Sequence, residues 1–355
     1  MRKLKPITIS NRQISPDNPP FIIAELSANH NGRLDTALRL VEEAHNAGAD
    51  AIKLQTYRPD TITLNCSNED FQIHGGLWDG RTLYDLYSEA HMPWEWHKPI
   101  FDCARDIGIT VFSSPFDTTA VDLLESLGAP AYKIASFEAI DLPLIRYAAS
   151  TKKPIIISTG MADAEEIQQA IDTARNAGSQ EIAILHCVSG YPAPAADYKL
   201  RTIPDMIERF GVVTGLSDHT LDNTTAIASI SLGASIVEKH FTLDRSGGGP
   251  DDSFSLEPPE LAHLCKACRV AWSALGDVDY GRKPSERANV KFRRSLYFVK
   301  NVPKGAVITS DSVRSVRPGY GLPPSALDRV IGRRAQREIF QNTPVTWDAI
   351  DDTTG

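Results

Sequence analysis

The sequence predicts an α/β protein in which a (β/α)8 TIM barrel is followed by a small C-terminal domain. Two observations predict the barrel: eight short apolar runs alternate with stretches of helical periodicity, and they do so over about 250 residues. Strands that alternate with helices form a parallel sheet, and eight such units are the number that closes a barrel. A doubly wound open sheet is the alternative, but no Gly-rich dinucleotide-binding fingerprint follows the first strand.

The eight expected strands are short runs rich in Ile, Val and Ala. They are Phe21–Ser27, Ala51–Thr56, Ile109–Pro115, Ala131–Ser136, Pro154–Gly160, Glu181–Cys187, Val212–His219 and Ser235–Phe241. Apolar residues recur with helical spacing between them, and most of these stretches end at a Gly, which stops a helix. The expected helices are Arg33–Gly48, Trp94–Gly108, Thr119–Gly128, Leu142–Ser150, Ala164–Gly178, Pro204–Gly211, Thr224–Leu232 and Pro259–Leu275.

One connection is much longer than the others. Residues 57–92 contain a short helical pattern at Leu83–Ala90 and several aromatic residues, namely Phe71, Trp78, Tyr84 and Tyr87. A connection of this length in a compact domain is usually functional or disordered, and its aromatic residues argue against disorder. We therefore expect it to lie over the mouth of the barrel, where it could select the substrate.

Changes in composition set the expected domain boundaries. Residues 1–276 contain the barrel, and residues 277–292 are polar and charged, which is typical of a linker. Residues 293–355 contain short apolar runs such as Ser295–Val299 and Ala306–Ile308. This pattern predicts a small mixed domain of roughly 60 residues, a size that gives only a modest core.

Composition also argues against several functions and locations. A net charge of −8 disfavours binding to nucleic acid or to an anionic membrane, because both require clustered cations. No run approaches the ~20 apolar residues of a membrane span, and the basic N-terminus lacks the apolar core of a signal peptide. The five cysteines are an odd number without a secretion signal, which predicts reduced thiols and a cytoplasmic location.

Two histidines follow the last two expected strands. His219 ends one strand and His240 lies near the end of the next, with the helical run Thr224–Leu232 between them. A strand–helix–strand unit makes its strands parallel neighbours, so both imidazoles reach the same level of the sheet. A single buried histidine is more often an ordinary core residue, but two at matching strand ends favour one shared divalent metal ion.

Polar side chains also mark the ends of the other expected strands. Catalytic groups of (β/α)8 enzymes come from these C-terminal ends. Here the ends supply Glu25, Lys53, Gln55, Ser114, Lys133, Ser136, Glu138, Ser158, Thr159, Ser189 and Ser217. Cations combined with hydroxyl groups suit a small phosphorylated carboxylate, and two imidazoles leave most of a metal's coordination sphere open for water and substrate.

Several motifs that contain these residues resemble the sialic acid synthase family. They are FIIAELSANHNG at 21–32, AIKLQT at 51–56, YKIASFE at 132–138, ISTGM at 157–161, GLSDHT at 215–220 and EKHF at 238–241. The pseudaminic acid synthase branch of that family is resembled by GGLWD at 75–79, LYDLY at 83–87, PWEWH at 93–97 and SFSL at 253–256. The resemblance covers almost the whole chain.

The resemblance implies a (β/α)8 barrel joined to a C-terminal antifreeze-like (SAF, β-clip) domain. It also implies condensation of phosphoenolpyruvate with an open-chain amino sugar to give a nonulosonic acid and phosphate through C–O cleavage. For the branch named above, the sugar is 2,4-diacetamido-2,4,6-trideoxy-L-altrose and the product is pseudaminic acid. Synthesis of sialic or legionaminic acid is the nearest alternative.

Roles for single residues are implied in the same way. His219 and His240 would bind a divalent cation, Mn²⁺ or Mg²⁺, and Glu25 would orient or deprotonate a water beside it. Phosphoenolpyruvate would be held by Lys53, Lys133, Ser136, Ser158, Ser189 and Ser217, and the sugar would be bound by Gln55, Glu138, Tyr191, Asp251 and Arg317. Arg317 would come from the SAF domain and reach the active site of the other subunit in a domain-swapped homodimer.

Two positions depart from the pattern of sialic acid synthases. Ser189 stands where they have Asn, although a hydroxyl can still donate to a phosphate. Asp252 stands where the bacterial enzymes have His, which argues against N-acetylmannosamine as the substrate. The residues alone leave two other functions open, a Schiff-base aldolase with Lys133 or Lys53 as nucleophile and a non-catalytic sugar-binding scaffold.

Overall fold

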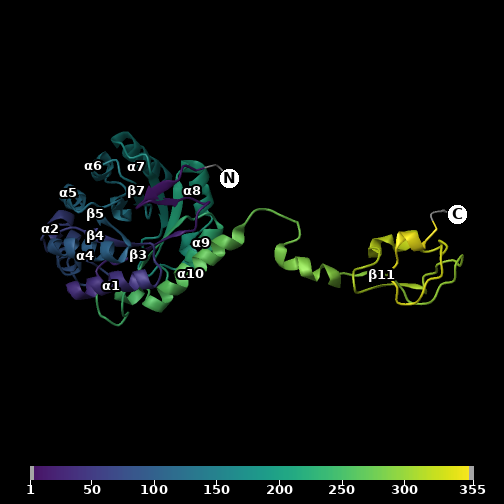
Figure 1. Ribbon diagram of the computed structural model, residues 1–355. Coiled ribbons are helices and arrows are strands. Elements are labelled where there is room, and N and C mark those ends of the chain that lie inside the picture. Colours follow the sequence, from purple (N-terminus) through teal and green to yellow (C-terminus); the bar gives the residue numbers. More distant parts are fainter. Residues whose placement is uncertain (1–3, 352–355) are drawn as a thin grey trace. The chain divides into compact units, whose positions relative to one another are not determined.

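The computed structural model describes residues 4–351 of the chain, which form two compact units, the first ending at Gly276 and the second beginning at Asp277. In the first unit, eight parallel strands close into a barrel in the order β10-β3-β4-β5-β6-β7-β8-β9 (Figure 1). The strands are β3 (Phe21–Glu25), β4 (Ala51–Thr56), β5 (Thr110–Pro115), β6 (Tyr132–Ile134), β7 (Ile155–Ser158), β8 (Ile182–Cys187), β9 (Val213–Asp218) and β10 (Ile236–His240). The predicted TIM barrel is confirmed, and the open sheet is wrong.

Helices follow the strands and surround the barrel (Figure 1). They are α1 (Leu34–Asn46), α4 (Trp94–Ile107), α5 (Thr118–Ser126), α6 (Leu142–Ser150), α7 (Ala164–Ala177), α8 (Thr202–Phe210), α9 (Thr224–Ser231) and α10 (Pro258–Leu275). Helix α7 begins where the Asp163 side chain accepts N–H groups of the first turn, and it buries an apolar stripe of helical spacing that includes Ile167 and Ile171. None of the helices within residues 4–351 is long and apolar enough to cross a membrane.

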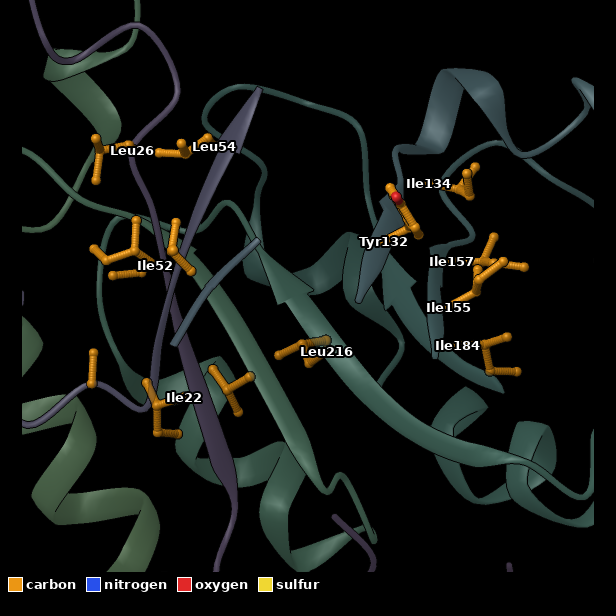
Figure 2. Packing of buried hydrophobic residues seen from close by; sticks show 14 of the residues in the cluster. Ile22, Leu26, Ile52, Leu54, Tyr132, Ile134, Ile155, Ile157, Ile184 and Leu216 are labelled. Carbon is orange, nitrogen blue, oxygen red and sulfur yellow. The ribbon is translucent and has the colours of Figure 1, made fainter. Parts of the chain in front are cut away.

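Side-chain alternation along the strands produces two hydrophobic layers. One layer packs between the strands and the helices and includes Ile22, Ile52, Tyr132, Ile155 and Leu216 (Figure 2). The other fills the barrel interior with Phe21, Ile23, Ala51, Phe112, Ala131, Ile156, Ala183, Leu185, Val213 and Ile236. Because strand side chains alternate between faces, residues an even number of positions further along also point inward. These residues are Glu25, Lys53, Ser114, Lys133, Ser158, Cys187, Ser217 and Glu238.

An N-terminal hairpin that was not predicted from the sequence belongs to the same interior layer. It consists of β1 (Ile7–Ile9) and β2 (Arg12–Ile14), paired antiparallel. Its turn residues Ser10 and Asn11 both have positive φ, 46° and 64°, as tight two-residue hairpin turns require. The isoleucines of the hairpin are buried in the interior cluster, so the barrel is apolar on this side and polar at the C-terminal ends of its strands.

The second unit is a small mixed domain. Its strands β11 (Ser295–Phe298) and β12 (Val313–Val316) pair antiparallel, and it also contains η6 (Pro324–Ala326), α11 (Leu327–Val330) and η7 (Trp347–Ala349). The core contains Leu296, Phe298, Val302, Ile308, Val313, Val330, Ile339 and Val345. Residues 284–292, which were expected to be part of an irregular linker, form the 3-10 helix η5 (Pro284–Phe292), started by Pro284 at its first turn.

Candidate active site

The barrel register brings the two predicted metal-binding histidines together. Strand β9 pairs with β10 so that Asp218 lies opposite Lys239, and the next residue on each strand is His219 and His240. Their ring centres are 5.4 Å apart and both side chains are buried. His219 Nδ1 lies 2.8 Å from the Val188 carbonyl oxygen, whereas the buried His240 Nδ1 has no hydrogen-bond partner among the described residues.

The two rings differ in their electrostatic surroundings. Burial lowers the pKa of His240 well below its ordinary value, and the positive charges of His219 and Lys53 lower it further. Burial also disfavours the charged form of His219, but a hydrogen bond to Cys187 and the charge of that thiolate outweigh it and raise the pKa of His219. His240 is therefore a neutral imidazole with an unused nitrogen, which is the form that binds metals.

This arrangement fits a divalent cation held by two imidazoles. Within residues 4–351, no group of three or more His, Cys, Asp and Glu side chains is arranged to hold a metal ion. The nearest carboxylate oxygen to the unpartnered nitrogen is Asp251 Oδ2, which lies 3.9 Å from His240 Nδ1. A cation at the imidazole pair would thus take most of its ligands from water and substrate.

Lys53 and Glu25 form one half of a charged floor below the histidines. Lys53 Nζ lies 2.5 Å from Glu25 Oε2 and donates to Ser114 Oγ at 3.3 Å. Gln55 Nε2 donates to Glu25 Oε1 and to Ser27 Oγ, each at 2.9 Å. Burial raises the pKa of Glu25 despite the adjacent ammonium group, so this carboxylate is poised to accept or share a proton.

Lys133 and Glu238 form the other half of the floor. Lys133 Nζ donates to Ser158 Oγ at 2.6 Å and lies 3.5 Å from Glu238 Oε1, which also accepts from Ser217 Oγ at 3.1 Å. Burial lowers the pKa of Lys133. Glu238 was not among the predicted site residues, although strand alternation identifies it, because it lies two positions before His240 and therefore faces inward.

Three groups converge where the chain leaves strands β6, β7 and β8. The Gly160 amide donates to Ser136 Oγ at 3.2 Å, and Ser136 begins the 3-10 helix η2 (Ser136–Glu138). A Cβ atom at Gly160 would lie 2.8 Å from Ser136 Oγ and would collide with Ser189 Oγ, so only glycine allows this approach. Ser189 Oγ is buried without a hydrogen-bond partner among the described residues, and it is available to a ligand oxygen.

A cavity of about 570 Å³ opens beside His240. Its polar side is formed by Ser27, Gln55, Glu138, Ser189, His240 and Asp251. Its apolar side is formed mainly by residues of the long connection, which holds α2 (Pro59–Ile62), η1 (Glu69–Phe71) and α3 (Leu83–Ala90), and includes Ile62, Ile73, Leu83, Leu86, Tyr87 and Phe116. The predicted position of residues 57–92 at the barrel mouth, with a helix at Leu83–Ala90, is confirmed.

Trp78 joins the long connection to the loop after β10. Its indole N–H donates to the Pro250 carbonyl at 3.1 Å, and its ring centre lies 6.1 Å from that of Tyr191. Tyr191 in turn packs on His219 with ring centres 4.3 Å apart. The predicted sugar-binding residue Tyr191 therefore lies between Trp78 of the long connection and the histidine pair.

The two predicted sugar-binding carboxylates are both half-buried. Burial raises the pKa of Glu138 to about 7 and also raises the pKa of Asp251, which accepts a short hydrogen bond from Ser27. Both line the cavity. The remaining predicted sugar-binding residue, Arg317, lies in the second unit directly after β12, and its role stays a prediction.

Comparison with known proteins places these features in a family. The NeuB family matches residues 40–280, and the SAF domain matches residues 293–351. The chain is 44% identical to the pseudaminic acid synthase of Campylobacter jejuni over 91% of this chain and 94% of that protein. It is 42% identical to the pseudaminic acid synthase of Helicobacter pylori over 94% of this chain and 98% of that protein.

A solved structure shows the same likeness. The N-acetylneuraminic acid synthetase of Leptospira borgpetersenii, in complex with citrate, superposes with a TM-score of 0.72 at 31% identity, over 81% of this chain and 95% of that chain. The barrel, the paired histidines at its mouth and the matches along the chain agree with one another. The chain therefore belongs to the NeuB family and ends in an SAF domain.

Proposed function

We propose that this chain condenses phosphoenolpyruvate with 2,4-diacetamido-2,4,6-trideoxy-L-altrose to give pseudaminic acid and phosphate. The observation that carries the proposal is a basic, hydroxyl-lined barrel floor that meets a cavity with one apolar side. The floor suits an enol phosphate, and the apolar side suits a sugar that carries two acetamido groups and a terminal methyl group. The identity to two pseudaminic acid synthases over most of the chain supports the same substrate pair.

Phosphoenolpyruvate binds on the floor through its carboxylate and phosphate. Lys53 and Lys133 supply the charges, and the hydroxyl donors are Ser136, Ser158, Ser189 and Ser217. The two lysines are already paired with Glu25 and Glu238, so part of their charge is balanced inside the protein. This balance matters because positive charge develops at C2 of the enol phosphate during the reaction, and unpaired ammonium groups beside C2 would oppose it.

Carbon–carbon bond formation joins C3 of phosphoenolpyruvate to the aldehyde carbon of the sugar. A divalent cation held by His219 and His240, Mn²⁺ or Mg²⁺, would supply Lewis-acid polarisation of the aldehyde oxygen. Glu25 takes a proton from the water that attacks C2, and this proton is returned to the former aldehyde oxygen, while the remaining water-derived hydroxyl proton leaves with the phosphate. The resulting tetrahedral carbon expels phosphate by breaking its C–O bond, which leaves an α-keto acid.

The sugar occupies the cavity above the floor. Gln55, Glu138, Tyr191 and Asp251 face it from the polar side, and the long connection encloses it from the other side. Holding both reactants in one orientation can contribute ~7–11 kcal/mol to lowering the barrier.

Phosphate release from phosphoenolpyruvate tests this function. Turnover with 2,4-diacetamido-2,4,6-trideoxy-L-altrose in the presence of Mn²⁺ is expected, whereas N-acetylmannosamine or removal of the metal should give little. Preferential turnover of N-acetylmannosamine or of the legionaminic acid precursor would instead assign the chain to another branch of the family.

A Schiff-base aldolase that uses Lys133 is the alternative favoured by one observation, the lowered pKa of that buried amine. Borohydride would trap a covalent pyruvate or sugar adduct on Lys133 in that case, and chelators would not inhibit. Metal-dependent turnover without a trapped adduct supports the synthase.

We further propose a domain-swapped homodimer in which residues 277–292 link the barrel to the SAF domain of residues 293–355. Arg317 of one subunit would then reach the barrel of the other subunit. A cytoplasmic location agrees with the five cysteines, which are all free.

A further inference from the structure

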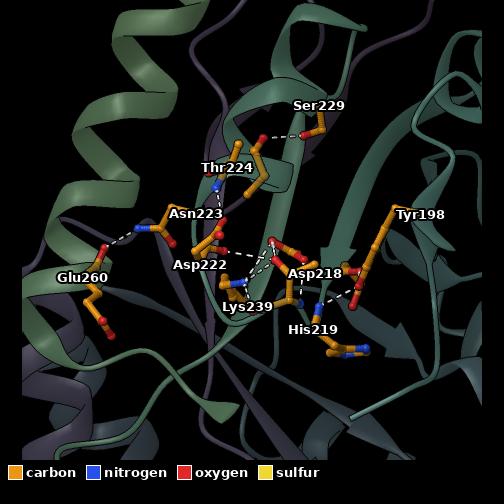
Figure 3. Close-up of polar contacts among 12 residues, drawn as sticks. Tyr198, Asp218, His219, Asp222, Asn223, Thr224, Ser229, Lys239 and Glu260 are labelled. Carbon is orange, nitrogen blue, oxygen red and sulfur yellow. Dashed lines mark hydrogen bonds and ion pairs between the residues drawn. The ribbon is translucent and has the colours of Figure 1, made fainter. Parts of the chain in front are cut away.

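Each histidine of the site directly follows a buried charged residue. Asp218 precedes His219 and Lys239 precedes His240, so alternation turns these two side chains to the outer face of the barrel wall, away from the substrate cavity. Lys239 Nζ lies 2.9 Å from Asp218 Oδ2, and the two side chains are 1% and 0% exposed (Figure 3). The ion pair therefore bridges β9 and β10 immediately behind the imidazoles.

The same pair fixes the backbone around His219. Lys239 Nζ also donates to the Thr220 carbonyl and lies 3.4 Å from Thr220 Oγ1. Asp218 Oδ1 accepts the Thr220 N–H at 2.9 Å, and its other oxygen accepts the Thr220 hydroxyl at 3.2 Å. The residues on both sides of His219 are thus tied to β10.

A second contact fixes His219 itself. Its backbone N–H donates to the Tyr198 hydroxyl at 2.6 Å, and that hydroxyl donates to the Ser217 carbonyl at 3.2 Å (Figure 3). With its Nδ1 2.8 Å from the Val188 carbonyl oxygen, His219 is held both at its backbone and at one ring nitrogen. The Lys239–Asp218 pair is what anchors the turn after β9 to the strand that carries His240.

Fold stability alone does not account for a buried ion pair at this position. A buried pair loses the hydration of both charges, and replacing such a pair with apolar residues is often neutral or stabilising. The outer faces of the same two strands are apolar at Leu216 and Val237, two residues earlier. On the outer faces of β9 and β10, the only charged side chains are those of Asp218 and Lys239, which directly precede the two histidines.

We propose that Asp218 and Lys239 are positioning residues that hold His219 at the separation from His240 needed to share one divalent cation. This inference rests on the metal site of the proposed function. Mutation of residues that hold metal-coordinating side chains in position typically lowers metal affinity or activity by about 10–100-fold.

The test measures Mn²⁺ affinity of the full-length, metal-free chain by titration calorimetry. Lys239→Met and the double variant Asp218→Leu/Lys239→Met should bind Mn²⁺ about 10–100-fold more weakly. Phosphoenolpyruvate affinity without metal should stay within about twofold, because neither residue faces the floor. The exchanged variant Asp218→Lys/Lys239→Asp, which keeps an ion pair, should recover part of the lost affinity.

Matched controls separate positioning from general stability. Lys98→Met removes the partner of an exposed ion pair on α4, at 2.6 Å from Asp102, and should leave Mn²⁺ affinity unchanged. If the ion pair has a purely structural role, Lys239→Met should melt at a lower temperature, but its folded fraction should bind Mn²⁺ as tightly as the unsubstituted chain does. That result would overturn the proposal. If the single variant does not fold, the double variant, which leaves no unpaired buried charge, gives the same readout.

Mn²⁺ binding by the unsubstituted chain separates a failure of the positioning role from a failure of the proposed metal site. Mn²⁺ binding that His240→Ala abolishes, together with unchanged binding in Lys239→Met and in the double variant, would overturn only the positioning role. Lack of Mn²⁺ binding by the unsubstituted chain would overturn the proposed metal site and the positioning role together.

Discussion

Replacing either histidine of the candidate metal site should abolish most of the activity. His219→Ala and His240→Ala should each reduce phosphate release by at least about 10³-fold, because one imidazole cannot hold the cation that polarises the aldehyde. The barrel should remain folded, since its interior layer lies further along the strands toward their N-terminal ends. Steady-state kinetics and circular dichroism check both statements, with His263→Ala on α10 as the control. Substantial turnover in either folded variant would count against the shared metal.

Glu138 predicts a pH dependence of stability. Burial raises its pKa from 4.5 to about 7, so the folded state holds the proton more tightly than the unfolded state. The stabilisation is complete below about pH 4.5 and is lost as the pH rises through about 7. Glu138→Gln cannot ionise, and it should therefore be more stable than the unsubstituted chain by about 3 kcal/mol above about pH 8.

Urea denaturation at several pH values measures this difference. The advantage of Glu138→Gln should shrink toward zero near about pH 4.5. An advantage independent of pH would mean that Glu138 is ionised or solvated in the folded chain.

Whether a site residue could be predicted from the sequence depends on its position along its strand. Glu25, Lys53 and Lys133 could be predicted as site residues because they lie on barrel strands, whose C-terminal ends carry catalytic groups. Glu238 and Cys187 face the same interior, but they are indicated only by side-chain alternation along their strands and not by a position after a strand end. The hydrogen bonds of Trp78 and Tyr198 join segments far apart in sequence, and no local pattern indicates them.

At the scale of elements, we expect residues of the long connection to determine which sugar the chain prefers. Leu83 on α3 lines the apolar side of the cavity, where methyl groups of the sugar would pack. Leu83→Ser should lower kcat/KM for the diacetamido trideoxy sugar by about 10-fold, because a hydrophobic pocket gains about 1–3 kcal/mol per methylene-sized contact. The KM for phosphoenolpyruvate should not change. Leu77→Ser is the control, since Leu77 belongs to the same connection but is 51% exposed and is absent from the cavity lining.

Barrel elements could be predicted to within two residues at most boundaries, because each strand and helix has its own periodicity and stop signals. The N-terminal hairpin was missed because its strands have only three residues each. Its signal was present in the alternating isoleucines around Ser10 and Asn11. Helix η5 was missed because a charged, polar stretch without an apolar stripe does not predict a helix.

At the scale of the whole molecule, the barrel could be predicted from the count of βα units, whereas the SAF domain could be named only through resemblance. Short strands and bridges such as Val302–Ile339 hold the second unit together, and these pairings depend on residues distant in sequence. The proposed dimer is not indicated by any local sequence pattern. It is best tested by asking which subunit supplies Arg317.

Mixing two inactive variants answers that question. His240→Ala lacks a working barrel site but keeps Arg317, and Arg317→Ala keeps the barrel site but lacks the arginine. If Arg317 acts on the other subunit, random exchange between equal amounts should restore about one quarter of the unsubstituted activity, because half of the dimers are mixed and each contains one complete site. If Arg317 acts within its own subunit, no mixed dimer contains a complete site and activity stays at the level of the separate variants. A mixture of His219→Ala with His240→Ala provides the control, since both changes lie in the same barrel site and neither arrangement can complement them.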